Sequence, residues 1–266
     1  MKKVLIVNDL NSCCNCSLNV MIPISSELGI TPCPLPTGIY SNSKCFGDVS
    51  FIDCTIEMEN FINAWKVNNI KYDGIMTGFM LSEKQIDIIE NYIKYNNFSD
   101  VLIDPVMGDD GILFGCFSND YVNRMREFIN NSEIITPNLT ELCLLTDVDY
   151  HEISSYDIDK MLIIIEKLSK KLNKVVITTG IPLNDKIITV IYDGLLKSVC
   201  ALKYGNRVIG TGDIFSSIVF SEYLNGKKLY DAVSVAVSYI SNLIKENINN
   251  NDYDPNYGLS LRKIKK

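Results

Sequence analysis

Short apolar segments alternate with longer segments of helical periodicity along most of the chain. Residues 4–7 are continuously apolar, which is typical of a strand buried on both faces of a parallel sheet. Further strands are predicted at residues 31–35, 72–77, 101–104, 133–136 and 174–179. A repeated strand–helix–strand order implies right-handed crossovers around one sheet that helices cover on both faces. We therefore expect an α/β fold with a mostly parallel central sheet.

The segments between these strands supply the helices, one hairpin and a long loop. Helices are expected at residues 18–28, 57–68, 82–96, 118–130, 138–145, 157–172, 213–225 and 228–247. Ser17 and Ser82 are the predicted N-caps of the first and third of these helices. Asp193-Gly194 predicts an antiparallel hairpin within residues 187–202. Residues 36–54 are expected to form a long functional loop. No composition shift marks a second domain, so residues 1–248 should form one three-layer α/β/α domain and residues 249–266 a loose polar tail.

Composition excludes several classes of function. The chain has 266 residues and a single histidine, His151, in a polar stretch expected at the surface. Ser-His-Asp hydrolases and multi-histidine zinc sites are therefore disfavoured. A net charge of −7 disfavours nucleic acid as a partner. The apolar run near the N-terminus is too short for an export signal or a membrane span, so we expect a cytoplasmic protein with reduced thiols.

The cluster Cys13-Cys14-x-Cys16 could suggest a metal site. It lacks the second cysteine pair or the histidines that zinc sites use, so scattered structural thiols are the favoured interpretation.

The segment with the clearest chemical meaning is Gly210-Thr211-Gly212-Asp213 at the start of a predicted helix. The free N–H groups and positive dipole end of such a helix form an anion-binding site. Asp213 in the first turn could accept a proton from an attacking hydroxyl, which suits phosphoryl transfer. The alternative is a glycine turn with an ordinary helix-start aspartate. Neither a Walker loop nor a complete dinucleotide fingerprint is present.

Two further segments carry carboxylates at predicted strand ends. Asp104 ends a buried strand, and the turn that follows contains Asp109 and Asp110, a set that could hold hydrated Mg²⁺. Asn138 and Glu141 lie three residues apart at the start of a helix, which also fits a purely structural capping box. For Asp109 and Asp110, an ordinary surface turn is the structural alternative.

Taken together, the motifs resemble the ribokinase-like superfamily and its pyridoxal (vitamin B6) kinase branch. They are Asn8-Asp9, Asp-Pro-Val-Met-Gly-Asp at 104–109, Thr-Pro-Asn-x-Thr-Glu at 136–141, Thr-Thr-Gly at 178–180 and Gly-Thr-Gly-Asp at 210–213. The resemblance implies a ribokinase-like fold and an ATP-dependent kinase with Mg²⁺, and it leaves open a monovalent cation such as K⁺. It also implies a homodimer and a B6 vitamer as the small-molecule substrate.

The same resemblance implies roles for individual residues. Asp213 would be the catalytic base, and Gly210, Thr211 and Gly212 would form the anion hole. Metal binding would involve Asp104, Asp109 and Glu141. Nucleotide binding would involve Asn138, Glu141, Thr178 and Thr179, with residues 199–208 beside the adenine. Substrate binding would involve Asp9, Ser43, Lys44, Phe46 and Phe79.

Departures from the resemblance are concentrated at the substrate end. Asp9 stands where many pyridoxal kinases have serine, and Asn42-Ser43-Lys44-Cys45-Phe46 replaces a Thr-His-Thr-Gly-aromatic run. Phe46 and Phe79 could enclose a heteroaromatic ring or could be ordinary core residues. Hydroxymethylpyrimidine kinases usually carry a glycine-rich stretch after the first strand that this chain lacks, yet they remain an alternative. A second alternative is a vitamin- or nucleotide-binding regulator without catalysis, against which the intact Gly-Thr-Gly-Asp argues.

Overall fold

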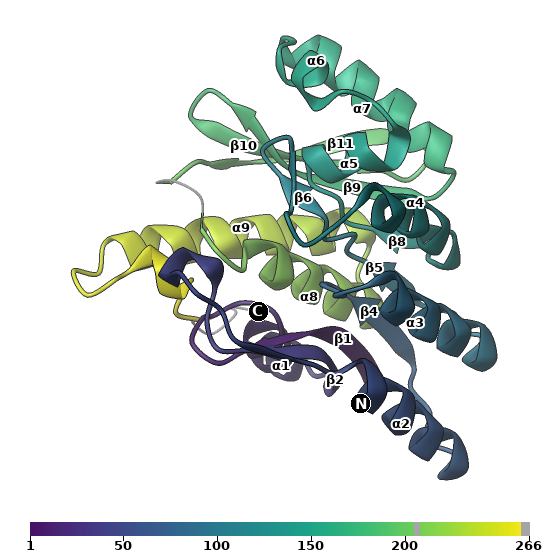
Figure 1. Ribbon diagram of the computed structural model, residues 1–266. Coiled ribbons are helices and arrows are strands. Elements are labelled where there is room, and N and C mark those ends of the chain that lie inside the picture. The colour runs from purple at the N-terminus through teal and green to yellow at the C-terminus, as the bar shows by residue number, and fades with distance from the viewer. Residues whose placement is uncertain (205–207, 262–266) are drawn as a thin grey trace.

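The protein is built around a nine-stranded sheet in the computed structural model, which describes residues 1–204 and 208–261 (Figure 1). The sheet strands are β1 (Lys3–Asn11), β2 (Thr31–Tyr40), β3 (Phe51–Asp53), β4 (Gly74–Thr77), β5 (Val101–Ile103), β8 (Ile134–Ile135), β9 (Val175–Leu183), β10 (Lys186–Tyr192) and β11 (Leu196–Leu202). Their spatial order is β11-β10-β9-β8-β5-β4-β1-β2-β3. The six central strands from β9 to β2 pair in parallel, and β3, β10 and β11 are antiparallel additions. The expected mostly parallel sheet is confirmed.

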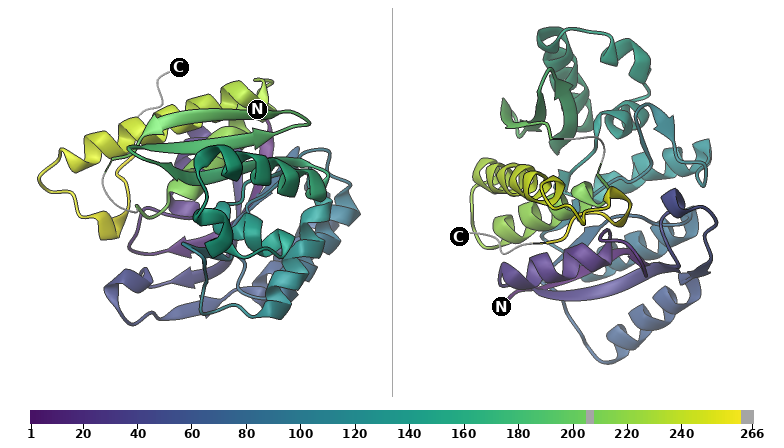
Figure 2. Two further views of the ribbon diagram at one scale, coloured as in Figure 1. Left: turned by 90° about the horizontal axis from the view of Figure 1, so that it is seen from above. Right: turned by 90° about the vertical axis from the view of Figure 1, so that its left-hand side faces the viewer.

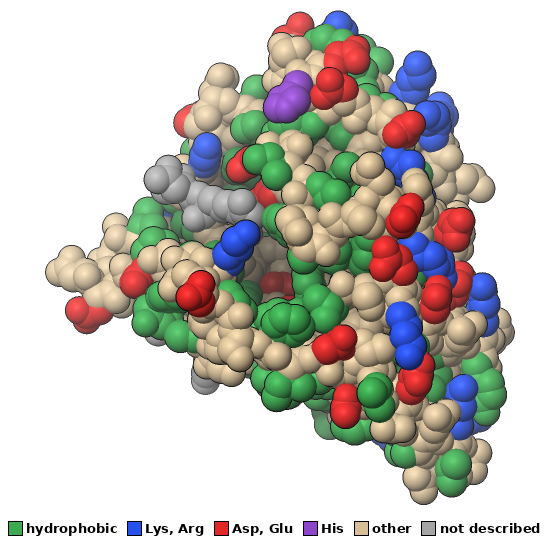
Figure 3. All heavy atoms as spheres, viewed as in Figure 1, with side chains coloured by type: hydrophobic (Ala, Val, Ile, Leu, Met, Phe, Trp, Pro, Cys, Tyr) green, Lys and Arg blue, Asp and Glu red, His purple; other side chains and the backbone are tan. Residues whose placement is uncertain are grey.

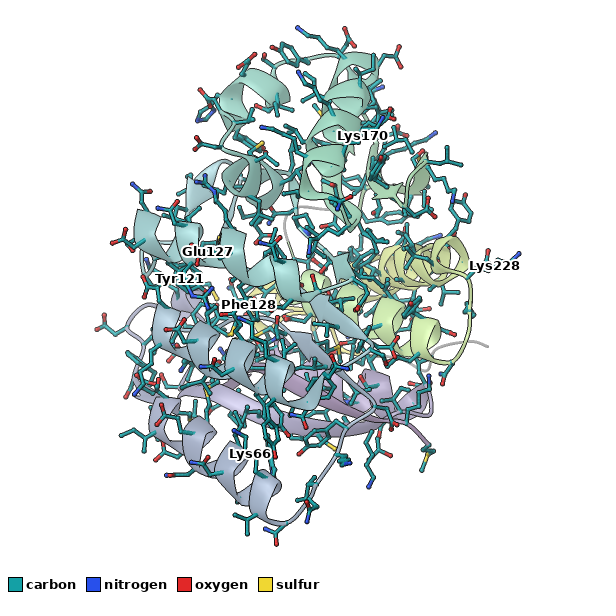
Figure 4. All side chains as sticks on the ribbon, turned by 90° about the vertical axis from the view of Figure 1, so that its right-hand side faces the viewer. Lys66, Tyr121, Glu127, Phe128, Lys170 and Lys228 are labelled. Atoms are coloured by element: carbon teal, nitrogen blue, oxygen red, sulfur yellow. The ribbon has the colours of Figure 1, made fainter. Side chains whose placement is uncertain are left out.

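Helices cover both faces of the sheet, which gives the three layers that the sequence predicts (Figure 2). One face packs against α1 (Leu18–Glu27), α8 (Thr211–Leu224) and α9 (Leu229–Ile248). The other face packs against α2 (Thr55–Val67), α3 (Glu83–Asn96), α4 (Asn119–Phe128), α5 (Leu139–Thr146) and α7 (Ile158–Leu172). Figure 4 looks onto this second layer, where Tyr121 and Phe128 on α4 are buried. None of the helices in the described residues is long and apolar enough to span a membrane.

The apolar runs form buried strands because each is covered on both sides. Residues of β1 alternate between the two hydrophobic clusters: Leu5 and Val7 belong to one, Val4 and Ile6 to the other. This two-sided burial explains why the run is continuously apolar instead of alternating.

Strand β2 is longer than the predicted residues 31–35, although it contains three prolines. The N–H of Thr31 donates to Lys2 beside β1, and backbone groups of a strand alternate in direction. Pro32, Pro34 and Pro36 therefore place their missing N–H groups on the opposite side. Strand β3 pairs there only with residues 38–40. The prolines are tolerated because no strand of the described residues pairs with that side of residues 32–36, so no ladder hydrogen bond is lost.

Local structure differs from expectation at several other points. The expected loop of residues 36–54 contains the end of β2, the short helix η1 (Lys44–Phe46) and β3. Ser17 and Ser82 precede α1 and α3 as expected, but neither side chain makes a cap hydrogen bond. The polar stretch around His151 forms the short helix α6 (Tyr150–Ser154), and His151 is exposed as expected.

The C-terminal segment is the largest departure. It was expected to be loose after residue 248, yet residues 249–261 fold back onto the domain. Here η3 (Pro255–Tyr257) forms, and the side chain of Leu259 is fully buried in the cluster that α1, α8 and α9 share. In Figure 1 this yellow segment lies beside the dark blue turn of η1.

Candidate active site

The polar residues singled out in the sequence gather at the carboxyl ends of the parallel strands. Asn8 lies in β1, Asp104 follows β5 and Thr136 follows β8. Ligands of open α/β sheets bind at this edge, where the strand ends meet helix N-termini. Figure 3 shows a hollow on this face of the molecule, with acidic side chains at its floor and hydrophobic side chains along its rim.

Asp213 is held at the start of α8 by two segments from the other end of the chain. Its Oδ1 accepts a hydrogen bond from Asn8 Nδ2 at 2.8 Å, and its Oδ2 accepts one from the backbone N–H of Ser17 at 2.8 Å. Desolvation raises the pKa of the Asp213 carboxyl, and these two hydrogen bonds offset part of the rise. A carboxylate whose proton affinity is raised and whose orientation is fixed is suited to act as a general base.

The backbone around Asp213 is shaped for close approach. Gly210 has φ +82°, and a Cβ there would lie 2.4 Å from the carbonyl oxygen of Asn15, so only glycine fits. Ser17 has φ 52°, an uncommon conformation for a residue with a side chain, and its N–H points at the Asp213 carboxylate. Strain of this kind is tolerated where function requires it. The first N–H groups of α8 lack intrahelical acceptors, as in any helix, and Gly212 among them is exposed.

Asp104 lies beside this helix start. A Cβ on Gly212 would be 3.9 Å from Asp104 Oδ2. The same oxygen accepts a hydrogen bond from Ser216 Oγ at 2.8 Å, and that hydroxyl lies 3.1 Å from Thr136 Oγ1. Burial and the nearby charge of Asp213 raise the pKa of the Asp104 carboxyl. The anion-binding helix start and a buried carboxylate therefore share one spot.

Asn138 and Glu141 form the predicted capping box of α5. Asn138 Oδ1 accepts from the N–H of Glu141, and Glu141 Oε2 accepts from the N–H of Asn138. Glu141 Oε1 also accepts from the N–H of Met107, and Asn138 Nδ2 donates to the carbonyl of Gly108. These bonds tie α5 to the hairpin of β6 (Gly108–Asp109) and β7 (Ile112–Leu113). These contacts are compatible with both interpretations of the pair, a structural capping box and a part of the nucleotide site.

The expected metal ligands fit Mg²⁺ only in part. Within the described residues, no three His, Cys, Asp or Glu side chains are grouped so that they could hold a metal ion alone. Glu141 is fully engaged by backbone N–H groups. Burial and the repulsion from Asp104 raise its pKa, a rise that a nearby cation would reverse. Mg²⁺ commonly uses one or two carboxylates and completes its shell with water and phosphate oxygens. Asp104 suits that arrangement, with Glu141 acting through charge.

The two threonines expected along the nucleotide differ in accessibility. Thr178 is fully buried, and its Oγ1 has no hydrogen-bond partner within the described residues. Thr179 is partly exposed, and its N–H donates to the carbonyl of Pro137. Thr179 is thus the better placed to meet a ligand. Residues 205–207 of the expected adenine stretch lie outside the described residues.

Asp9, which the sequence predicts to bind substrate, lies close enough to Asp213 to feel its charge. The residue is 8% exposed, and its N–H donates to Asn8 Oδ1 at 2.9 Å. Burial raises the pKa of Asp9 to about 7; a hydrogen bond from Ser17 opposes the rise and the charge of Asp213 adds to it. The same Asn8 Oδ1 accepts from the N–H of Phe79, so one amide links Asp9, Phe79 and Asp213.

The two aromatic residues expected to enclose a ring belong to separate groups. Phe79 contacts Tyr40 at 6.0 Å and Phe117 at 5.5 Å between ring centroids. Phe46 instead contacts Tyr257, with 4.8 Å between ring centroids and the ring planes tilted by 59°.

The polar residues of the same loop are placed separately. Ser43 immediately precedes η1, and Lys44 is exposed within it. Desolvation raises the pKa of the Cys116 thiol, and the positive charge of Lys44 offsets part of this rise. Lys44 therefore lies near Cys116, which precedes Phe117.

Several residues of the site received no role from the sequence. Asn8 was noted only as part of a motif, and its contacts with Asp213 depend on the fold. The spacing of Ser216, three residues after Asp213, could have placed both on one side of α8. No local signal marks Ser17 as a donor to Asp213 or Tyr257 as a neighbour of Phe46.

Comparison with known proteins finds similarity to kinases of small molecules. A family model described as phosphomethylpyrimidine kinase matches residues 55–256. A candidate phosphomethylpyrimidine kinase from Bacteroides thetaiotaomicron is 33% identical, with 99% of this chain and 92% of that chain covered and a TM-score of 0.93. A second crystal form, with pyridoxal, is 34% identical, covers 97% and 92%, and has a TM-score of 0.89.

Two further proteins are similar at lower identity. A pyridoxine kinase from Bacillus subtilis is 29% identical over 198 residues, or 70% of this chain and 69% of that protein. The structure of an ADP complex of Bacillus subtilis pyridoxal kinase is 22% identical, with a TM-score of 0.79 and 92% of each chain covered. At that identity the likeness concerns the fold alone.

Proposed function

This chain belongs to the phosphomethylpyrimidine kinase family, within the ribokinase-like superfamily, and we propose that it transfers the γ-phosphoryl group of ATP to the hydroxymethyl group of a B6 vitamer. The vitamer would be pyridoxal, pyridoxine or pyridoxamine. The observation that carries the proposal is the arrangement of Asp213. Its carboxylate is fixed by Asn8 and Ser17 at the open start of α8, next to Asp104.

The reaction follows from this arrangement. The substrate hydroxymethyl approaches Asp213, whose carboxylate accepts the hydroxyl proton as the oxygen attacks the γ-phosphorus of ATP. The bond to the leaving ADP oxygen breaks as the new P–O bond forms. The N–H groups at the start of α8 donate to the oxygens of the transferring group, and the helix dipole favours their negative charge.

Mg²⁺ would be held near Asp104, with Glu141 contributing negative charge, and would neutralise charge on the phosphate oxygens. Ser216 orients Asp104 through the hydrogen bond at 2.8 Å. Asn138 would position the nucleotide side by holding the hairpin at Gly108 against α5.

The substrate class rests on the relatives and on the substrate end of the site. The Bacteroides thetaiotaomicron relative has been solved with pyridoxal. Here the backbone N–H groups of Asp9 and Phe79 bind the same oxygen of Asn8, and burial raises the pKa of the Asp9 carboxyl to about 7. A heteroaromatic ring with polar substituents would find an aromatic surface in Phe79 and a proton donor or acceptor in Asp9. The family name favours the second candidate, a hydroxymethylpyrimidine or its phosphate. Both substrates present a hydroxymethyl group on a nitrogen heterocycle to the same base.

A coupled assay of ADP formation tests the proposal with pyridoxal, pyridoxine, pyridoxamine and hydroxymethylpyrimidine. We expect the highest kcat/KM with a B6 vitamer. A higher kcat/KM with hydroxymethylpyrimidine would overturn the substrate assignment. Vitamin binding without any ADP formation would indicate a regulator and overturn the enzyme assignment.

Asp213→Asn tests the base directly. A positioned general base contributes about 10²- to 10⁴-fold, so we expect kcat with the best substrate to fall by that factor. Asp231→Asn is a matched control, because Asp231 also lies in the first turn of a helix, α9, but is exposed. It should leave kcat unchanged. Near-normal kcat for a folded Asp213→Asn variant would mean that another group accepts the proton.

We also propose that the enzyme acts as a cytoplasmic homodimer. All nine cysteines are free, which suits a reducing compartment. Strand β3 and the start of α2 expose Phe51, Ile52 and Ile56 at one edge of the sheet. Exposed edge strands with apolar side chains favour association. Sedimentation of the purified chain at the mass of two copies would support the dimer, and a single-copy mass would contradict it.

A further inference from the structure

The C-terminal segment of residues 254–260, here called the C-terminal strap, folds onto the loop that carries the donor to the catalytic base. The N–H of Asn15 donates to the carbonyl of Tyr257 at 2.8 Å, and Asn15 pairs with Gly258 as a parallel bridge. The strap is anchored at its far end, where Asn247 exchanges hydrogen bonds with the backbone of Ser260. The buried Leu259 adds an apolar anchor. These contacts define one docked position for a segment that composition alone describes as polar and loose.

The strap and the glycine turn at the start of α8 both pack against the backbone of Asn15, from two sides. The carbonyl oxygen of Asn15 would lie 2.4 Å from a Cβ on Gly210 and 2.6 Å from a Cβ on Gly258. Both glycines have positive φ, +82° and +75°. Asn15 is therefore packed between the turn that opens α8 and the strap. Two residues later, the N–H of Ser17 reaches Asp213 Oδ2.

The strap also places a ring against Phe46, a residue that the sequence predicts to bind the substrate. Tyr257 contacts Phe46 with 4.8 Å between ring centroids and an angle of 59° between the ring planes, and both residues are exposed, at 45% and 38%. The thiols of Cys14 and Cys45 each approach the carbonyl of Asn256 at 3.6 Å. The loop after β1, the turn of η1 and the strap thus meet at Asn256 and Tyr257. Figure 1 shows η1 beside the yellow C-terminal segment.

We propose that the strap completes the active site, with Tyr257 acting with Phe46 as a specificity-determining wall for the ring of the substrate and Gly258 acting as a positioning residue for the base. Gly258 acts through Asn15 and Ser17 on Asp213. The proposal rests on the proposed function, because it assigns these residues to the same hydroxymethyl-phosphorylating site. Tyr257 and Gly258 lie just beyond residues 55–256, the part of the chain that the family model matches.

The role of Tyr257 is tested by comparing the effect of a substitution on KM for pyridoxal with its effect on KM for ATP. In the full chain, Tyr257→Ala should raise KM for pyridoxal roughly 3- to 10-fold, the range expected for losing one aromatic contact, and leave KM for ATP unchanged. Tyr257→Phe keeps the ring and should restore the wild-type KM. If pyridoxal proves a poor substrate, hydroxymethylpyrimidine takes its place. Equal KM values for the wild type and Tyr257→Ala would overturn the role of the wall, as would parallel changes for both substrates.

The role of Gly258 is tested by comparison with another glycine at positive φ, Gly226, where an added Cβ would meet no other atom of the described residues. Gly226 has φ +89° and nothing within 4 Å of a would-be Cβ, whereas a Cβ on Gly258 would meet Asn15. Displacing Asn15 should move Ser17 from the base, so Gly258→Ala should lower kcat about 10- to 100-fold with KM for ATP unchanged. Gly226→Ala should keep kcat within about twofold. Equal kcat for Gly258→Ala and Gly226→Ala would overturn the positioning role.

The activity of the wild type distinguishes a failure of the proposed function from a failure of the role proposed for the strap. If the wild type is active and Tyr257→Ala and Gly258→Ala keep the wild-type kcat and KM, the strap has no role in the active site. The proposed function would still stand. Absence of turnover with every hydroxymethyl substrate would overturn the proposed function and the role of the strap with it. Circular dichroism confirms that each variant is folded; if Gly258→Ala fails to fold, the Tyr257 variants decide the outcome.

Discussion

At the scale of single residues, the site depends on a few contacts between distant parts of the chain. Asn8 is fully buried, and its amide serves Asp213, Asp9 and Phe79 at once. An asparagine can do this because its oxygen accepts two hydrogen bonds while its NH₂ donates. A carboxylate in its place would repel Asp213, and an apolar residue would leave both N–H groups unpaired.

Burial of Asp9 leads to a pH-dependent stability. Its pKa is raised to about 7 in the folded protein and is near 4 in an unfolded chain. Between these values the folded form holds the extra proton, so stability falls as pH rises. Asp9→Asn removes the buried charge and should raise the free energy of unfolding at pH 8. One pKa unit corresponds to about 1.4 kcal/mol, so an increase of a few kcal/mol is expected.

Urea unfolding at pH 8 and pH 4 measures this effect. The advantage of Asp9→Asn should shrink towards pH 4, where the wild-type carboxyl is protonated in the folded state. Asp48→Asn is the control, because Asp48 is exposed and its substitution should change stability little at either pH. An equal gain for Asp9→Asn at both pH values would argue against a buried charge at Asp9.

At the scale of elements, two helix starts are arranged around the site. Helix α8 begins at Gly210 and offers its N–H groups to an anion, while α5 begins at Asn138 and closes its own start with a capping box. The difference lies in the cap residue: glycine has no side chain to bond the free N–H groups, and asparagine does. One helix start is thereby left available to phosphate and the other holds the neighbouring hairpin.

Asn138→Ala should separate the structural from the functional part of this cap. Loss of the cap hydrogen bond costs about 1 kcal/mol of stability. Asp157→Ala is matched to it, since Asp157 caps α7 through the N–H of Lys160 at 2.9 Å. Both variants should lower Tm by similar amounts, and only Asn138→Ala should also raise KM for ATP. If KM for ATP is the same in the two variants, Asn138 is a cap and nothing more.

At the scale of the whole molecule, the sheet separates two hydrophobic clusters and leaves the strand ends uncovered. One cluster lies under α1, α8 and α9, and the other under α2, α3, α4, α5 and α7. The chain crosses between the layers repeatedly, so residues 8, 104, 136 and 213 arrive at one edge although they are spread over most of the sequence. The proposed chemistry uses carboxylates and backbone N–H groups from that edge and no imidazole.

His151→Ala tests whether imidazole has any part in the reaction. His151 is exposed on α6, and Figure 3 shows the histidine side chain on the outer surface, away from the hollow. We expect kcat and KM within about twofold of wild type and a Tm change of a degree or so, as for most surface substitutions. A large fall in kcat for the folded variant would show that the assigned proton acceptor is wrong.

Much of the fold could be predicted because its signals are local. Two-sided burial makes the central strands continuously apolar, and the Asp193-Gly194 turn marked the hairpin correctly. The predicted helix at residues 138–145 matches α5 because asparagine and glutamate at the right spacing satisfy its first N–H groups. Strand β2 was underestimated because proline is a poor strand former on average, and only its place near the sheet edge makes the prolines harmless.

The sequence by itself determined the layered α/β architecture and singled out Asp213 as the proposed base, because helix periodicity, apolar runs and Gly-Thr-Gly-Asp depend on neighbouring residues. Only the tertiary structure decided what holds that base: Asn8 and Ser17 lie 205 and 196 residues away from Asp213 along the chain. It also decided that a polar C-terminus docks beside Phe46. A few buried anchors and backbone hydrogen bonds suffice for docking, and these arise from the partner surface, which no stretch of the tail contains.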